Sequence, residues 1–174
     1  MKKILLHHCC VVCTPEVLKF FWKNFDEVTG LWFNPNIYPE HEFQKRLTAL
    51  KIFSSQENHN LIIKTDYSNE KWLEEVTKIG IEEPKRCEFC YYLRLKTTAT
   101  SAKIFSIEDF STTLLASPYQ KHELVKQIGE KVAKETGVNF IYNDFRPLFY
   151  NGKNEIRKRG LYTQKYCGCK FSVR

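Results

Sequence analysis

The sequence predicts an α/β fold with a doubly wound, mostly parallel sheet of about five strands. Short apolar segments rich in β-branched and aromatic residues alternate with longer segments whose apolar residues recur at helical spacing. Polar or sulfur-bearing residues follow each short segment, where open parallel sheets place their ligands. With 174 residues, 43% of them hydrophobic, we expect one domain over residues 1–174, ending in a basic helix and a cysteine tail.

The first strand is expected at residues 3–6, directly before a group of cysteines. A helix is expected to begin at Thr14, a favoured N-cap residue that is followed by a proline and an acid in the first turn. Val17, Phe21 and Phe25 continue this helix at the spacing of one apolar face.

The second strand is expected over residues 28–33, where the apolar run stops at Asn34-Pro35-Asn36. A charged amphipathic helix is expected between residues 39 and 59. One face of this helix carries Phe43, Leu47, Leu50 and Phe53. Residues 61–63 predict a third strand, closed by Asp66.

Two consecutive helices are expected next. Asn69 is the expected cap of the first, and Gly80 ends it. Its apolar residues are Trp72, Leu73, Val76 and Ile79. The second is expected over residues 86–103, with a C-x-x-C motif in its opening turn.

The last two strands flank another helix. Residues 112–116 predict the fourth strand, ended by Ser117-Pro118, and residues 138–142 predict the fifth, ended by Asp144-Phe145-Arg146. The intervening helix, which Gly137 stops, carries Leu124, Val125, Ile128 and Val132.

Seven cysteines occur in three clusters that only folding can bring together. They are Cys9, Cys10 and Cys13; Cys87 and Cys90; and Cys167 and Cys169. The odd count and the absence of a secretory segment argue against a disulfide framework. Thiolates at C-x-x-C and C-x-C spacing suit zinc or iron–sulfur ligation. Seven thiols exceed the four that one tetrahedral zinc or one cluster needs, so either some are not ligands or two metal centres lie side by side.

Local geometry adds an expectation for two of these clusters. Cys87 and Cys90 are three residues apart, so they share one face of a helix, and the helix dipole is expected to lower their thiol pKa. Gly168, between Cys167 and Cys169, permits a tight turn and a close backbone approach. A structural zinc site is the main alternative, and a thioredoxin-like oxidoreductase is a weaker one.

The net charge of +7 is concentrated at the C-terminus. Residues 151–174 contain seven basic residues and one acid, a net charge of +6, which leaves +1 for the rest of the chain. Aromatic residues are interleaved with these cations, so this segment is either an RNA-binding surface or a solvated basic helix. The expected RNA-binding residues are Lys153, Arg157, Lys158, Arg159, Lys165 and Tyr162.

Other polar residues at the expected strand ends are candidates for chemistry. Asp66, Asp144 and Tyr119 are the expected catalytic residues, although each aspartate could instead close a turn. His7 and His8 are expected to be mainly structural. The first loop lacks the glycines of a phosphate-binding loop, so the sequence does not favour ATP binding. The short apolar run at the N-terminus is no signal peptide, and no apolar stretch is long enough to span a membrane, so a cytoplasmic protein is expected.

Several motifs together resemble the QueH-type epoxyqueuosine reductases. The first is Leu5-Leu6-His7-His8-Cys9-Cys10-Val11-Val12-Cys13-Thr14, similar to the L-L-H-x-C-C-A-P-C-S opening of that family. The others are Asn34 to Pro39, Arg86 to Tyr91, Leu93-Arg94-Leu95 with Thr98-Ala99, Phe110 to Gln120, Asp144-Phe145-Arg146 and Leu161 to Cys169. These motifs span nearly the whole chain in the family's order. Val11-Val12 stands where the family usually has Ala-Pro, and Thr163 where it usually has arginine.

The resemblance implies a fold similar to adenine nucleotide α-hydrolase domains. It also implies reduction of the epoxide of epoxyqueuosine, in the wobble position of tRNA, to the alkene of queuosine by iron–sulfur chemistry. The expected cofactors are a [4Fe-4S] cluster and a second metal ion, with iron favoured, because removing the oxygen takes two electrons. The expected partners are tRNA carrying epoxyqueuosine and an unidentified electron donor.

Within this interpretation each group has an expected role. The cluster ligands are Cys10, Cys87 and Cys90, with Cys9 as the fourth. Cys167 and Cys169, with Cys13 or an aspartate, hold the second metal. Asp144, if its pKa were raised, supplies a proton. Two other classes stay open: a tRNA thiolase on the same fold, which needs an ATP loop, and a zinc-stabilised RNA-binding module without catalysis.

Overall fold

The computed structural model describes residues 1–173 and contains a five-stranded sheet in the order β3-β2-β1-β4-β5. Every neighbouring pair of strands is parallel. The strands are β1 (Lys3–His7), β2 (Glu27–Trp32), β3 (Leu61–Ile63), β4 (Asp109–Thr112) and β5 (Asn139–Phe140). The fold class expected from the alternating pattern is therefore confirmed.

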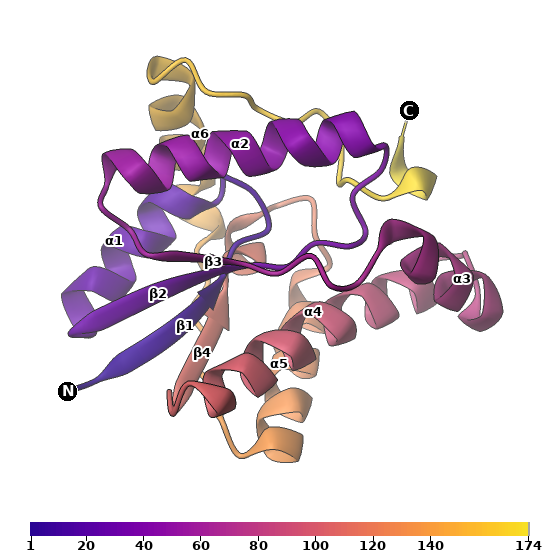
Figure 1. Ribbon diagram of the computed structural model, residues 1–174, viewed down its shortest axis with the longest axis horizontal. Coiled ribbons are helices and arrows are strands. Elements are labelled where there is room, and N and C mark those ends of the chain that lie inside the picture. Colours follow the sequence, from indigo (N-terminus) through magenta and orange to yellow (C-terminus); the bar gives the residue numbers. More distant parts are fainter. Residues whose placement is uncertain (174) are drawn as a thin grey trace.

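The helices cover both faces of this sheet. They are α1 (Thr14–Asn24), α2 (Glu40–Gln56), α3 (Asn69–Ile79), α4 (Lys85–Ile104), α5 (His122–Thr136) and α6 (Phe149–Lys158). In Figure 1, α1, α2 and α6 lie on one side of the strands, and α4 and α5 lie on the other. After β3 the chain crosses to the far side of β1, so β1 and β4 flank the point where the strand order reverses. In open α/β sheets this is the point at which ligands bind.

The fourth expected strand is wrong in its extent, and this affects the site. Pairing with β1 ends at Thr112, and Thr113–Ala116 form a 3-10 helix. The hydroxyl of Thr112 accepts a hydrogen bond from the amide of Leu114 at 3.1 Å, which caps that turn. The apolar residues that suggested a strand are instead buried in this turn.

Other boundaries differ less. The fifth strand covers only Asn139–Phe140, because it is an edge strand that pairs with β4 alone. The cap of α3 is Ser68, whose hydroxyl accepts from the amide of Lys71 at 3.2 Å. The side chain of Asn69 donates instead to the carbonyl of Pro35 at 2.7 Å.

The core lies along β1, whose residues Ile4, Leu5 and Leu6 are fully buried. Aromatic rings fill the layer between the sheet and the outer helices: Phe145 packs against Phe20 and Phe21 with ring centroids 5.1 and 5.9 Å away. This packing holds the chain before α6 against α1. Within the described residues, no helix has both the length and the apolar character required to cross a bilayer.

Candidate metal centre and cavity

Three thiols gather at the carboxyl end of β1. The sulfur atoms of Cys9, Cys10 and Cys13 all lie within 4.8 Å of one another, and the three residues are buried. The Cys9 and Cys10 sulfurs are 3.7 Å apart. The hydroxyl of Thr113, in the turn after β4, accepts from the Cys9 amide at 2.9 Å and donates to the Cys9 sulfur at 3.2 Å. Both strands at the reversal point therefore build this triad.

The triad shares one favoured thiolate. Hydrogen bonds from the thiols of Cys13 and Cys9 lower the pKa of Cys10 well below its usual value. The same contacts make Cys10 the acceptor, so the pKa of Cys9 is raised to about 12 and that of Cys13 is also raised. A thiolate held by two further thiols is a ready donor set for a soft metal.

His7 and His8 directly precede the triad at the end of β1, and both are fully buried. The ring of His7 hydrogen-bonds Thr112 at 2.9 Å and Asn34 at 3.1 Å, while His8 bonds Thr14 at 3.0 Å. Burial is the main cause that lowers the pKa of His7 to about 3. Burial also lowers the pKa of His8, so both rings are neutral and hydrogen-bonded within the fold.

The other four cysteines come from the start of α4 and from the C-terminal tail. Cys90 and Cys169 are buried in one small cluster with Trp72 and Val76. Cys167 is exposed, and its sulfur accepts from the amide of Gln120 at 3.5 Å. Folding thus brings together Cys90 and Cys169, which are 79 positions apart in the printed sequence.

The helix dipole does not control the thiols of α4, contrary to expectation. Burial raises the pKa of Cys87 to about 11 and raises that of Cys90 as well. The expected lowering is therefore wrong, because loss of hydration outweighs the dipole at these positions. In the tail, a hydrogen bond from Cys167 lowers the pKa of Cys169 to about 5.

The tail is held by a buried arginine on α2. Arg46 donates to the carbonyls of Cys167 at 3.0 Å and Tyr166 at 2.9 Å, and its Nε donates to Glu42 at 2.7 Å. Gly168 has φ +124°, and a Cβ there would lie 2.9 Å from the Arg46 guanidinium. Gly168 therefore permits a close approach of the tail backbone to Arg46, and the expected approach to a ligand stays a prediction.

A second arginine, Arg94, lies among the thiols and is only 3% exposed. Its Nη2 donates to Asn34 at 2.7 Å, and its Nη1 lies 3.7 Å from the Cys90 sulfur. Its charge also acts on Cys9 and Cys167. Sequence reasoning noted Arg94 only as part of a motif; its position four residues after Cys90 on the same helix was the available signal.

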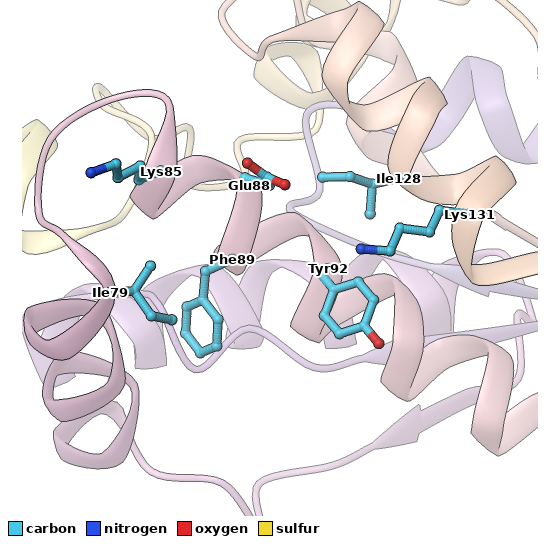
Figure 2. A pocket seen from close by; sticks show the side chains of 7 residues that line it. All are labelled: Ile79, Lys85, Glu88, Phe89, Tyr92, Ile128 and Lys131. Carbon is cyan, nitrogen blue, oxygen red and sulfur yellow. The ribbon is translucent and has the colours of Figure 1, made fainter. Parts of the chain in front are cut away.

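A cavity of about 660 Å³ opens above these groups. Cys9, Cys10, Cys13, Cys167 and Arg94 line its wall, and Tyr119 and α6 contribute to the rim. A smaller hollow of about 300 Å³ lies between Ile79, Phe89, Tyr92 and Ile128 (Figure 2). None of the described residues lining that hollow is a cysteine, whereas four cysteines line the larger cavity.

Two of the three expected catalytic residues lie elsewhere. Asp66 is 65% exposed at its side chain, pairs with Lys64 at 2.7 Å and does not line the cavity. Asp144 pairs with Arg146 at 2.6 Å, and hydrogen bonds from Arg146 lower its pKa to about 2. A raised pKa was the condition for Asp144 to supply a proton, and this condition is not met, because an adjacent guanidinium stabilises the carboxylate. Tyr119 does line the cavity.

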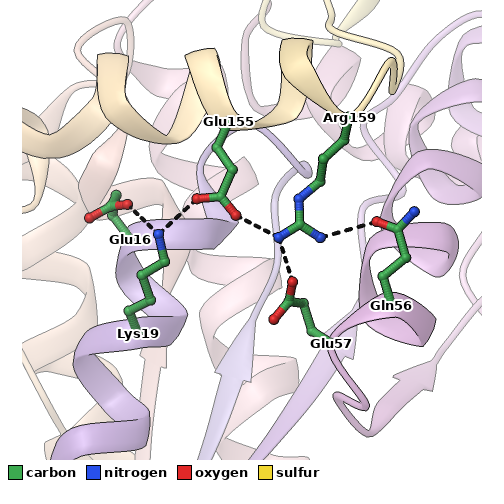
Figure 3. A network of polar contacts seen from close by, with 6 residues as sticks. All are labelled: Glu16, Lys19, Gln56, Glu57, Glu155 and Arg159. Carbon is green, nitrogen blue, oxygen red and sulfur yellow. Dashed lines mark hydrogen bonds and ion pairs between the residues drawn. The ribbon is translucent and has the colours of Figure 1, made fainter.

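The expected RNA-binding cations have different environments. Lys153, Arg157 and Lys165 line the cavity, whereas Lys158 is exposed and does not. Arg159 is committed to the fold: it pairs with Glu155 at 2.6 Å and with Glu57, and it donates to Gln56 at 3.0 Å (Figure 3).

Tyr162 is also engaged within the molecule, because its hydroxyl donates to Glu42 at 2.6 Å. Arg159 and Tyr162 therefore have partners within the molecule that the charge pattern does not show, and their role as RNA contacts stays a prediction.

The fold and site define a parallel α/β protein with a cysteine-lined cavity at the topological switch point. A family model described as "Epoxyqueuosine reductase QueH" matches residues 4–174. The chain belongs to the QueH epoxyqueuosine reductase family.

Individual relatives agree with this assignment. The chain is 36% identical to "Epoxyqueuosine reductase QueH" of Dehalococcoides mccartyi over 170 residues, which cover 98% of this chain and 92% of the relative. It is 33% identical to the protein of the same name from Thermotoga maritima, covering 99% of this chain and 91% of the relative. It is 31% identical to the protein of that name from Helicobacter pylori, in an alignment that covers 98% of this chain and 49% of the relative.

Proposed function

We propose that this protein is an epoxyqueuosine reductase that acts on tRNA in the cytoplasm and converts the epoxide in the wobble nucleoside to the alkene of queuosine. The observation that carries this proposal is the family match over residues 4–174 in a chain that lines one cavity with four of its seven cysteines. The reaction consumes two electrons and two protons and releases the epoxide oxygen as water.

The cysteines suit an iron–sulfur cofactor. The donor set around the cavity is rich in thiols, and the buried cation of Arg94 offsets the negative charge that several thiolates would create. We assign the [4Fe-4S] cluster to Cys10, Cys87 and Cys90, with Cys9 as the fourth ligand. Cys167 and Cys169 would then hold an iron ion.

The position of Cys13 bears on this assignment. Cys13 lies beside Cys9 and Cys10, so it competes with Cys9 to be the fourth ligand and is a less suitable partner of the tail cysteines. When bound, the two metal sites would supply the electrons and a Lewis acid for the epoxide oxygen.

The residues of the chain itself would position the substrate and control its proton supply. Asp144 is fully ionised at neutral pH, so it is not the acid. Tyr119 is the expected catalytic side chain that reaches the cavity, and its hydroxyl is a candidate proton carrier toward the departing oxygen. Arg94, at the cavity wall, holds Asn34 and the Cys90 sulfur in place.

The test is anaerobic purification followed by three measurements: iron and sulfide content, electron paramagnetic resonance, and conversion of epoxyqueuosine tRNA with dithionite as the electron source. We expect a brown protein that forms queuosine. The Cys87→Ala/Cys90→Ala variant should lose the chromophore and the sulfide. The Cys167→Ala/Cys169→Ala variant should keep much of the cluster absorption and lose turnover. A colourless wild-type protein that contains zinc and forms no queuosine would refute the proposal.

A further inference from the structure

Two exposed tyrosines pack against Phe149, and one of them, Tyr119, lines the cavity. Tyr119 is 69% exposed and Tyr150 is 60% exposed, although large aromatic side chains usually bury most of their surface. Both pack edge-on against Phe149, with ring centroids 5.8 and 5.2 Å away. Phe149 is itself buried, so it fixes the two rings from below. The hydroxyl of Tyr119 also contacts that of Tyr150 and raises its pKa.

These contacts leave most of both rings open to solvent. An edge-to-face contact occupies only a small part of a ring, and Phe149 contacts both tyrosines in this way. The two residues come from different parts of the chain, the loop after the 3-10 turn at Thr113–Ala116 and the first turn of α6. The fold therefore builds a fixed aromatic platform beside the thiol cavity.

Cations without acidic partners line the same cavity as Tyr119. Lys153 and Arg157 project from one face of α6 because they are four residues apart, and Lys165 precedes the cysteine tail. Within the described chain none of the three forms an ion pair, whereas Glu155, on another face of α6, pairs with Lys19 of α1 and with Arg159. Glu83 is the single acid among the described residues that line the cavity, and it pairs with Lys121 at 2.7 Å.

We propose that Tyr119 and Tyr150 form a stacking platform for unpaired bases of an RNA loop, whose phosphates contact Lys153, Arg157 and Lys165. Single-stranded RNA is the occupant that fits, because its bases are free to stack on aromatic faces while its backbone needs cations. The inference rests on the proposed function, since it assigns the tRNA loop that carries the modified nucleoside to this rim.

The platform also accounts for selection of a loop over a duplex. Bases in a duplex are stacked on each other and cannot reach a protein ring, so the two tyrosines can contribute only to unpaired RNA. The cations attract both kinds of RNA, because phosphates are present in each. The tyrosines and the cations should therefore have separable effects on binding.

The probe is an unmodified, labelled anticodon stem–loop RNA, compared with an RNA duplex of equal length, by fluorescence anisotropy over a range of salt concentrations. We expect Tyr119→Ala and Tyr150→Ala each to weaken loop binding about five- to hundredfold, as expected for a lost stack. Their salt dependence and duplex binding should be unchanged. Replacing Lys153, Arg157 and Lys165 by alanine should reduce the slope of log affinity against log salt by about 2, or about 0.7 per contact.

Matched variants keep this test interpretable. Tyr119→Phe and Tyr150→Phe retain the ring and should bind the loop like the wild type. Lys158→Ala removes a cation from α6 that does not line the cavity, so it should alter the slope least. Tyr92→Ala removes a tyrosine bound to Glu135 at 2.8 Å beside the other hollow, and should leave loop binding intact.

If the Tyr119→Ala/Tyr150→Ala variant binds the loop as tightly as the wild type, the platform is refuted. Conversion of epoxyqueuosine tRNA by the wild type is measured separately. Normal conversion together with intact binding by the double variant overturns this inference alone. Selective loss of loop binding by the double variant supports the platform even if the wild type forms no queuosine, in which case only the proposed reaction fails.

Discussion

Replacing Arg46 by methionine removes the side chain that holds the cysteine tail against α2. Arg46 is 2% exposed and donates to the carbonyls of Tyr166 and Cys167 as well as to Glu42. Glu42 is 4% exposed and would keep only the hydroxyl of Tyr162 as a close partner. Breaking a buried ion pair by removing one partner costs about 3–5 kcal/mol. We expect the free energy of unfolding to fall by this amount, measured in urea titrations that are monitored by circular dichroism.

A second variant separates the ion pair from the attachment of the tail. In Glu42→Leu/Arg46→Met both charges are gone, so no buried charge is left unpaired, and stability should return to within about 1–2 kcal/mol of the wild type. The tail carbonyls still lose their donors. Cys169, which is 6% exposed, should then become accessible in the metal-free protein. The assay is thiol labelling under native conditions, with the labelled cysteine identified by mass spectrometry.

The pH dependence gives an independent check. Burial raises the pKa of Glu42, but hydrogen bonds from Tyr162 and Arg46 outweigh it and lower the pKa below 4.5. A group whose pKa is lowered by folding stabilises the protein above its unfolded pKa, and this stabilisation is lost as the pH falls through the folded value. The double variant should lack this acid-sensitive component.

The labelling experiment gives the result that would refute the anchoring role of Arg46. This result is slow labelling of Cys169 in the double variant, at the rate of the wild type.

Three further predictions concern single residues. Gly168→Ala places a methyl group on a backbone with φ +124°, 2.9 Å from the Arg46 guanidinium. We expect the variant to lose the turn between Cys167 and Cys169 and to be less stable by about 1–3 kcal/mol. Lower metal content and a lower urea midpoint would show this. Arg159→Ala should lower the free energy of unfolding by about 1–2 kcal/mol, because it removes three polar contacts and the packing of Arg159 on the ring of Phe53. The control variant Lys153→Ala should change the free energy of unfolding by less than about 0.5 kcal/mol. Equal effects of the two variants would contradict the network in Figure 3. Arg94→Met removes a buried positive charge beside the thiols. The reduction potential of any bound iron–sulfur cluster should therefore become more negative in redox titrations. An unchanged potential would mean that Arg94 only holds Asn34 by its hydrogen bond.

The sequence by itself determined the fold class, the clustering of the cysteines and the family. Alternating apolar segments reveal strands and helices because burial requires a local periodicity, and the cysteine spacing is visible without any coordinates. The same local rules misjudged Thr112–Ala116, where a hydroxyl cap replaced strand pairing. Whether a segment forms a strand depends on whether the adjacent strand extends far enough to pair with it, and the local sequence does not contain this information.

Only the tertiary structure decided which charges and thiols act together. The sequence pattern treats Lys153 and Arg159 alike, yet Glu57 and Glu155 neutralise Arg159 and leave Lys153 at the cavity. It likewise made Asp144 a candidate acid, although Arg146 keeps it ionised. Burial and pairing set these properties, because the free energy of a charge depends on the groups and the water around it, and residues distant in sequence supply that environment.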